Sequence, residues 1–234
     1  TFGLGFHLEL STRPEKSIGT DEQWEDATSG LTAALDRYGA AYKINEGDGA
    51  FYGPKIDIHI KDAIGRTWQC GTIQLDMSLP ERFDLSYVGK DNDKHRPVMI
   101  HRVVYGSIER FLGILIEHFA GKFPLWLAPV QAVILPINDA LAPFAESVNA
   151  SFAMAGLRSR VDDRTESLNK KVREAQLAQI PLIITVGEKE KSAGTLSIRT
   201  LDGQVQYGIP KDQLIRAALD NVAERRLELN LFEN

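Results

Sequence analysis

The 234-residue sequence contains a single cysteine, Cys70, and has no apolar run long enough to cross a membrane. One cysteine excludes a disulfide framework and is typical of a reducing compartment. The best apolar run, around residues 111–119, is interrupted by Glu117 and His118, whereas a membrane span needs roughly 18 to 20 apolar residues in succession. We therefore expect a cytoplasmic protein without a membrane partner.

A basic excess is also absent, because 27 Lys and Arg residues stand against 32 Asp and Glu residues, which gives a net charge of −5. Proteins that coat nucleic acid through bulk electrostatics carry a basic patch, so any contact with nucleic acid should be local and specific. The GxxxxGK, GxSxG and HExxH motifs are missing, which removes the usual nucleotide-hydrolase, esterase and zinc-protease classes. The sequence opens at Thr1 without an initiator methionine or a signal-peptide pattern, and we expect its natural start to lie upstream.

Alternating apolar and polar residues predict strands in the first half of the chain. Residues 6–10 alternate, and residues 56–61 place isoleucines on one face and polar side chains on the other. A turn at residues 64–66 leads to a second strand at 67–76, which predicts an antiparallel hairpin.

Two helices and a further strand are predicted in the same half. Apolar residues three and four apart between Trp24 and Leu35 predict a helix that Thr20 or Asp21 caps and Gly39 ends. Residues 97–105 are typical of a buried strand, and the helix after it has Ile108, Phe111, Leu112, Leu115, Ile116 and Phe119 on its apolar side.

From residue 130 onward, strands and helices alternate. We expect strands at 130–137, 157–162, 182–186 and 195–200, and helices at 140–155, 167–179 and 211–228. This order predicts an α/β domain with a mixed sheet. The aromatic, proline-containing segment at 123–129 is the expected boundary, so we expect an antiparallel α+β domain at residues 1–124 and an α/β domain at residues 125–234.

The strand at 67–76 carries three neutral polar side chains, Gln69, Thr72 and Gln74. Such groups suit recognition of a small polar ligand, although a solvent-facing strand would explain two of them equally well. Strict alternation places Gln69 on the face opposite to Thr72 and Gln74. If all three line one pocket, an extra residue near Gly71 must form a β-bulge that resets the alternation.

His101 and Arg110 are the other candidates for chemistry. His101 lies within an apolar run, where it is either a hydrogen-bonded core histidine or a ligand. Arg110 lies three residues after Ser107 on one helix face, and it either pairs with a nearby carboxylate or binds phosphate.

Residues 97–111, PVMIHRVVYGSIERF, resemble motif 3 of class II aminoacyl-tRNA synthetases, a strand followed by a helix that carries an arginine. The blocks LSTRPEK (10–16), GAFYGPK (49–55), QCGTIQLD (69–76) and WLAPVQ (126–131) are similar to the threonyl-tRNA synthetase family and keep its order. The resemblance covers nearly the whole chain. It implies part of an α+β antiparallel class II catalytic core, including motif 3, at residues 1–124, and an α/β anticodon-binding domain with a mixed five-stranded sheet at 125–234.

The resemblance further implies a threonine–tRNA ligase, which joins threonine to ATP as threonyl-adenylate and transfers threonine to tRNA(Thr), with Mg²⁺ accompanying ATP. Arg110 is implied to hold ATP phosphate, and His101 is implied to be one of three protein ligands of a zinc ion. An open position on that zinc would select the threonine hydroxyl against valine, which an apolar pocket rejects poorly. The other implied site residues are Lys55 as a second catalytic residue, Tyr52, Gln69, Thr72, Gln74 and Ser107 in the substrate pocket, and Glu190, Arg199 and Arg173 at the anticodon.

In this family motif 1 at the homodimer interface, motif 2 with a second ATP-binding arginine, and the remaining zinc ligands belong upstream of Thr1. We therefore expect that the chain alone neither forms adenylate nor binds zinc tightly. The competing class is a noncatalytic tRNA-binding or regulatory relative. The presence of both His101 and Arg110 argues against it, because a binding module needs no zinc ligand together with a phosphate arginine.

Overall fold

The computed structural model describes residues 1–231 and divides into two compact units. One unit is Leu4–His118, and the other joins Thr1–Gly3 to the chain from Phe119 onward. Residues 232–234, the last of the expected second domain, lie outside the described residues. In the described part, every helix is too short or too polar to cross a membrane.

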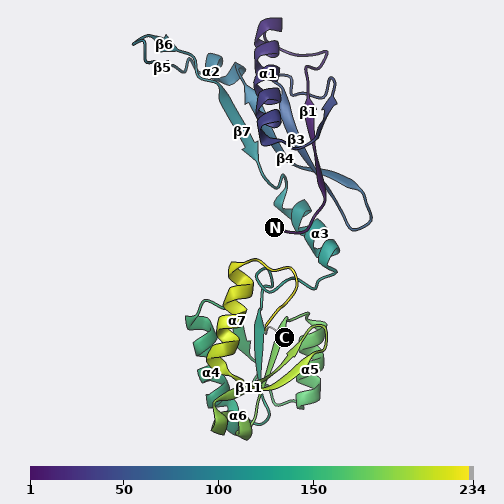
Figure 1. Cartoon of the computed structure of the whole chain (residues 1–234), viewed down its shortest axis with the longest axis vertical. Coiled ribbons are helices and arrows are strands. Elements are labelled where there is room, and N and C mark those ends of the chain that lie inside the picture. Colours follow the sequence, from purple (N-terminus) through teal and green to yellow (C-terminus); the bar gives the residue numbers. More distant parts are fainter. Residues whose placement is uncertain (232–234) are drawn as a thin grey trace. The chain divides into compact units, whose positions relative to one another are not determined.

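A five-stranded sheet forms the centre of the Leu4–His118 unit (Figure 1). Its strands follow the order β2 (Tyr42–Asn45), β1 (Phe6–Ser11), β3 (Lys55–Lys61), β4 (Thr67–Asp76) and β7 (Met99–Val103). The β3–β4 hairpin is confirmed, and all neighbours are antiparallel except β1 and β2. The parallel strand β2 was not predicted from the sequence, because its four residues are too few to show a period.

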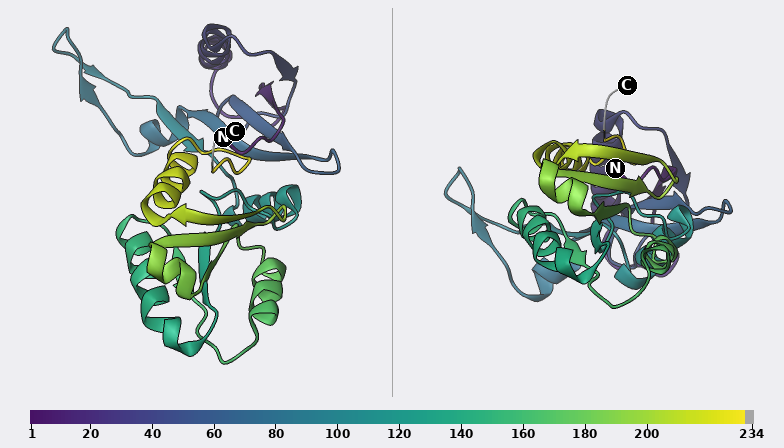
Figure 2. Two further views of the ribbon diagram at one scale, coloured as in Figure 1. Left: turned by 60° about the horizontal axis from the view of Figure 1, so that its bottom comes forward. Right: turned by 90° about the horizontal axis from the view of Figure 1, so that it is seen from below.

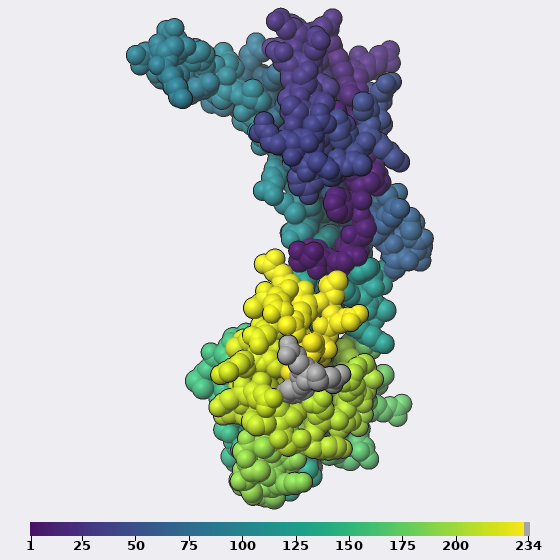
Figure 3. All heavy atoms as spheres, viewed as in Figure 1, coloured from purple at the N-terminus to yellow at the C-terminus, as the bar shows by residue number. Residues whose placement is uncertain are grey.

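Helix α1 (Asp21–Tyr38) covers the apolar face of this sheet, as predicted. The side chain of Thr20 caps it in a reciprocal capping box with Gln23, and Gly39 ends it in the left-handed region at φ 76°. Its apolar stripe packs against the leucines and isoleucines of β1 and β3. The opposite side of α1 lies at the surface of the unit (Figure 3). The other face of the sheet, which carries Lys55, Asp57 and His59 of β3, is the polar face.

The segment between β4 and the end of this unit differs from expectation. After α2 (Ser78–Arg82) and a small ribbon of β5 (Tyr87–Val88) and β6 (Lys94–His95), the chain enters β7 at the edge of the sheet. The interpretation of residues 97–105 as a buried strand is wrong: Val98 is 56% exposed and Ile100 is 61% exposed. Within the described residues no strand pairs with the outer edge of β7, and its apolar side chains therefore remain at the surface.

Helix α3 (Ile108–Phe119) follows β7 and is also covered only in part. Of its predicted apolar side, Phe111 and Leu115 are buried, whereas Ile108, Leu112 and Ile116 are exposed. At Gly106, which has φ 66°, an added Cβ would lie 2.9 Å from the carbonyl oxygen of Cys70. Glycine therefore brings the start of α3 close to the middle of β4.

The second unit is a three-layer α/β domain, and its mixed five-stranded sheet confirms the prediction (Figure 2). The strand order is β12 (Val205–Pro210), β11 (Thr195–Thr200), β10 (Leu182–Val186), β8 (Ala132–Pro136) and β9 (Ser159–Val161). Strands β8, β9 and β10 are parallel, and β11 and β12 are antiparallel to their neighbours. Helices α4 (Ala142–Met154) and α7 (Lys211–Ala223) pack on one face, and α5 (Leu168–Leu177) packs on the other.

Three elements of this unit were not predicted: the 3-10 turn η1 (Asp139–Leu141), α6 (Glu188–Ala193) and β12. Each is short or lacks a clear period. The last helix ends at Ala223 rather than at residue 228, and Arg225 then adopts φ 52°.

The turn between β3 and β4 is held by the carboxylate of Asp62. It accepts hydrogen bonds from Trp68 Nε1 (2.9 Å), from Arg66 Nε (2.6 Å) and from the backbone amides of Arg66 and Ile64. Burial alone would raise the pKa of Asp62, but these donors outweigh it and lower the pKa to about 2. Since the pKa of an unfolded Asp is about 3.9, the stabilisation is present above that pH and is lost as the pH falls through about 2.

We expect NMR titration of Asp62 to give a pKa near 2. The difference in unfolding free energy between the wild type and Asp62→Asn should shrink as the pH falls from about 4 to 2. A normal pKa for Asp62, or a difference that is constant over this range, would contradict the assignment.

Candidate active site

The predicted β-bulge is present and brings three polar side chains of β4 to one face. Ile58 pairs with Gly71 and His59 pairs with Gln69, so Cys70 is the extra residue. Thr72 and Gln74 then lie opposite Asp57 and Lys55. Directly paired residues share a face of an antiparallel sheet, and Gln69, Thr72 and Gln74 therefore line the polar face together.

A buried ion pair lies at the centre of this face. Lys55 Nζ lies 2.6 Å from Asp57 Oδ2 and 3.1 Å from Asp48 Oδ2. Asp57 is 1% exposed, and it also accepts hydrogen bonds from Ser11 Oγ (2.8 Å) and Gln69 Nε2 (2.5 Å). Burial lowers the pKa of Lys55, but its bonds to the two carboxylates outweigh that effect and leave the pKa raised. Lys55 is therefore a fixed cation.

Tyr52, Gln74 and His101 lie together at the β7 end of the face. The Tyr52 hydroxyl donates to Gln74 Oε1 (2.5 Å), and the Tyr52 ring meets the His101 ring edge-on at 5.9 Å. Burial, reinforced by the negative charge of Asp76, raises the pKa of Tyr52, so its phenol remains a donor. Phe51, Tyr52, Asp76 and His101 line a hollow of about 180 Å³ with residues of α2. This is below the roughly 300 Å³ of sites for drug-sized ligands and suits a small molecule such as an amino acid.

Two further details of this face indicate a ligand site. The Thr72 hydroxyl is buried and, within residues 1–231, has no hydrogen-bond partner. An unsatisfied buried hydroxyl costs roughly 1 to 3 kcal/mol unless a ligand or water completes it. His101 is only partly buried and bonds to Asp76 Oδ2 through Nε2 (2.8 Å), so it is neither a core histidine nor an isolated surface residue.

Ser107 and Arg110 lie at the start of α3, and their contacts do not reach the polar face. Ser107 Oγ donates to Glu109 (2.8 Å) and accepts from the Arg110 amide (3.3 Å). The Arg110 guanidinium lies 5.7 Å from the centre of the Trp68 ring. Within the described chain Arg110 forms no ion pair with a carboxylate.

His101 fits a metal site only in part. A metal-binding histidine commonly bonds to a carboxylate through its second ring nitrogen, and Asp76 is such a partner. Burial raises the pKa of Asp76, but the amides of Leu79 and Ser78 and the imidazole of His101 together lower it, so the carboxylate stays ionised. Among residues 1–231, His101 does not join a group of three metal-binding side chains, so zinc there needs ligands from outside the described residues.

The three anticodon candidates lie in the second unit, and two of them, Arg199 and Arg173, lie on the side of its sheet that α5 covers. Arg199 on β11 pairs with Ile183, which packs towards α5, and Arg173 is exposed on α5 itself. Both oxygens of Glu190 are engaged: Ser197 Oγ donates to one (2.7 Å) and the Gly187 amide to the other (3.0 Å). Burial raises the pKa of Glu190, but these donors outweigh it and keep the carboxylate ionised.

Asp57 and Asp76 are central to the polar face, but the sequence analysis did not identify them as site residues. Both are almost fully buried carboxylates with several donors. The alternation around residues 56–61 already places Asp57 on the same face as His59, so that signal was available. Asp76 follows Thr72 and Gln74 at the strand period, after the bulge, so alternation also places it on their face.

Comparison with known proteins agrees with this architecture. Residues 3–119 match the tRNA synthetase class II core domain (G, H, P, S and T), and residues 131–221 match the anticodon binding domain. The threonine–tRNA ligase of Desulfosudis oleivorans is 72% identical over 225 residues, and that of Desulfatibacillum aliphaticivorans is 70% identical over 232 residues. These matches cover 96% and 99% of this chain but 35% and 36% of the relatives. The chain thus spans about a third of their length.

A solved structure, the RNA binding domain of threonyl-tRNA synthetase from Cryptosporidium parvum, aligns with a TM-score of 0.86 and 40% identity. The alignment covers 98% of this chain and 56% of the Cryptosporidium parvum chain. The chain therefore belongs to the class II aminoacyl-tRNA synthetases and combines part of their core with an anticodon-binding domain. Within that class, it corresponds to the C-terminal part of a threonyl-tRNA synthetase.

Proposed function

We propose that this chain supplies part of the active site and the anticodon-binding domain of a threonine–tRNA ligase. The complete enzyme activates threonine with Mg²⁺ and ATP and transfers the threonyl group to tRNA(Thr). The unpartnered Thr72 hydroxyl, on a face that also carries a fixed Lys55 cation, is the observation that carries this proposal beyond the family match. We take residues 1–124 as the catalytic part and residues 125–234 as the anticodon-binding domain.

Threonine is bound near His101, at the small hollow beside Tyr52. His101 would be one of three protein ligands of a zinc ion, which would supply Lewis-acid binding of the threonine amino and hydroxyl groups when bound there. Asp76 orients the His101 ring, and the Tyr52 hydroxyl fixes the amide of Gln74. Thr72 is left to complete its hydrogen bonding with substrate.

ATP and the terminal adenosine of tRNA lie towards the β-bulge and the start of α3. Arg110 has no acidic partner in the described chain, and a guanidinium is suited to the charge that develops on phosphate. Lys55 contributes a positive charge that its two carboxylates hold in place. Gln69 on β4 and Ser107 at the start of α3 are the neutral hydrogen-bonding groups of this part of the site.

Threonine-dependent ATP–pyrophosphate exchange by the complete protein tests this function. We expect exchange with threonine and charging of tRNA(Thr), and we expect the 234-residue chain alone to be inactive. Absence of exchange in the complete protein, together with retained tRNA binding, would instead support the noncatalytic tRNA-binding or regulatory alternative.

We also infer that the complete ligase is a cytoplasmic homodimer. The lone cysteine supports a cytoplasmic location. The homodimer is inferred because motif 1 lies at the dimer interface in this family. Sedimentation of the complete protein at dimer mass is the expected result.

Arg199→Ala separates the anticodon role from catalysis. A hydrogen bond to a base edge is worth about 1 to 3 kcal/mol, so we expect kcat/KM for tRNA(Thr) to fall about tenfold or more while ATP–pyrophosphate exchange is unchanged. Arg216→Ala is the matched control, because Arg216 is exposed on α7, which packs on the other face of the sheet. Equal tRNA charging by both variants would remove Arg199 from the anticodon site.

A further inference from the structure

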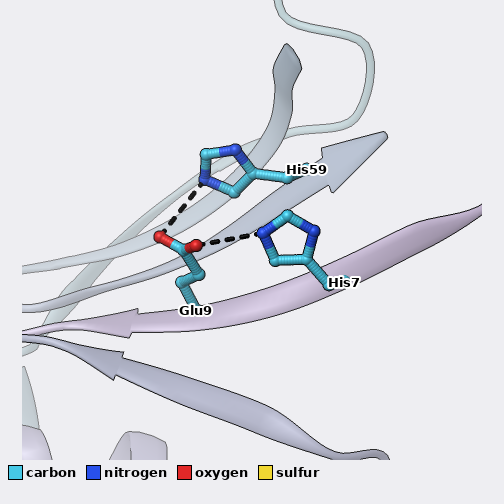
Figure 4. Close-up of side chains that lie close together, drawn as sticks. All are labelled: His7, Glu9 and His59. Atoms are coloured by element: carbon cyan, nitrogen blue, oxygen red, sulfur yellow. Dashed lines mark hydrogen bonds and ion pairs between the residues drawn. The ribbon is translucent and has the colours of Figure 1, made fainter. Parts of the chain in front are cut away.

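Three side chains that the proposed function does not use form a compact group on the first unit. His7 and Glu9 belong to β1, and His59 lies opposite His7 on β3. Figure 4 shows both imidazole rings turned towards the carboxylate of Glu9. His7 Nε2 lies 3.0 Å from Glu9 Oε1, and His59 Nε2 lies 3.6 Å from Glu9 Oε2.

We propose that His7, Glu9 and His59 bind a divalent transition-metal ion. Two imidazoles and one carboxylate form a donor set that suits zinc and its neighbours, and they leave further positions for water or an added ligand. In residues 1–231 this is the only group of three or more such side chains whose ligand atoms lie within 4.8 Å of one another.

The separations are close to those that a metal requires. Bonds of 2.0 to 2.1 Å in a tetrahedral site place ligand atoms about 3.3 Å apart. The distances of 3.0 Å from His7 to Glu9 Oε1 and 3.6 Å from His59 to Glu9 Oε2 lie on either side of this value, each to a different carboxylate oxygen. Because all ligand atoms are within 4.8 Å, the imidazole nitrogens need to approach each other by at most about 1.5 Å. The rings stack 4.9 Å apart at an interplanar angle of 13°, so rotation of the two side chains supplies this movement.

The backbone and the neighbouring residues hold the group in place. The ladder between β1 and β3 fixes His7 directly opposite His59. Asn45 Nδ2 donates to Glu9 Oε2 (3.1 Å) and orients the carboxylate, as outer partners of metal ligands do. Asp57, which lies opposite Glu9, is already engaged by Lys55, so Glu9 is the carboxylate left to bind an ion.

Partial exposure gives an ion access to the group. The side chains of His7, Glu9 and His59 are 28%, 17% and 20% exposed. This group is distinct from His101, which bonds to Asp76 on other strands. The absence of tight zinc binding expected at His101 therefore does not apply to it, and the proposal does not depend on the ligase activity.

Metal titration of the 234-residue chain, stripped with a chelator, tests the proposal. We expect saturable one-to-one binding of Zn²⁺ by calorimetry, and a visible absorption band when Co²⁺ replaces Zn²⁺. His7→Gln, His59→Gln and Glu9→Gln should each weaken Zn²⁺ binding at least about tenfold. Far-UV circular dichroism should show that substitutions at these partly exposed positions leave the fold intact.

His95→Gln is the matched control, since it removes an imidazole that bonds to a single aspartate and has no part in the proposed function. It should bind Zn²⁺ as the wild type does. Wild-type affinity in folded His7→Gln and His59→Gln would overturn the proposal, as would the absence of saturable binding in the wild type. The three side chains would then be a hydrogen-bonded cluster only.

Discussion

Replacing Lys55 with methionine is expected to lower the free energy of unfolding of the chain by about 3 kcal/mol. Methionine keeps much of the side-chain volume but leaves the carboxylate of Asp57 buried without its cation, and Asp57 is 1% exposed. Ser11 and Gln69 continue to donate to Asp57, which places the loss at the lower end of the range for a broken buried ion pair. Chemical denaturation of both proteins measures the difference.

Lys170→Met is the matched control for this experiment. Lys170 lies 2.6 Å from Glu166, the same distance as in the buried pair, but both partners are on the surface. We expect a loss of about 0.5 kcal/mol or less. Equal losses in the two variants would show that Asp57 is not left as an uncompensated buried charge when Lys55 is replaced.

The pH dependence of the Lys55 pair has a defined sign. Because the folded pKa of Lys55 is raised, its stabilising contribution is complete below the unfolded value of about 10.4 and is lost as the pH rises through the folded pKa. The difference between wild type and Lys55→Met should therefore decrease at alkaline pH. A difference that increases there would contradict the raised pKa.

Much of the arrangement of the polar face, including its β-bulge, could be predicted from the sequence. Requiring Gln69, Thr72 and Gln74 to share a pocket is enough to predict the bulge, because the strand period leaves no other way to align them. The bulge residue is Cys70, next to the predicted Gly71. The helix cap at Thr20 and the end at Gly39 were likewise given by local chemistry.

The failures of prediction concern features that depend on distant residues. An apolar run such as 97–105 indicates a buried strand, but its burial depends on whether another segment pairs with it. The His7–Glu9–His59 group shows the same limit. Alternation places each side chain on the polar face, but only the register between β1 and β3 brings the two histidines together.

His101→Ala in the complete ligase is expected to reduce kcat/KM for threonine at least about a hundredfold in ATP–pyrophosphate exchange. As a proposed zinc ligand, His101 would hold the metal ion that selects the threonine hydroxyl. Loss of even an outer partner of a metal site commonly lowers metal affinity or activity 10- to 100-fold. Discrimination against valine should fall as well, because an apolar pocket of this size separates the two amino acids poorly. Both amino acids should therefore be assayed.

His95→Ala provides the comparison that separates chemistry from folding. His95 is exposed on β6, bonds to Asp91, and does not line the hollow beside Tyr52, so its removal should leave exchange unchanged. Asp76 keeps its backbone donors from Ser78 and Leu79 when His101 is replaced, and the fold is expected to survive. Full exchange activity in His101→Ala would remove His101 from the zinc site, whereas lost activity without a change in thermal unfolding would support a direct role in threonine selection.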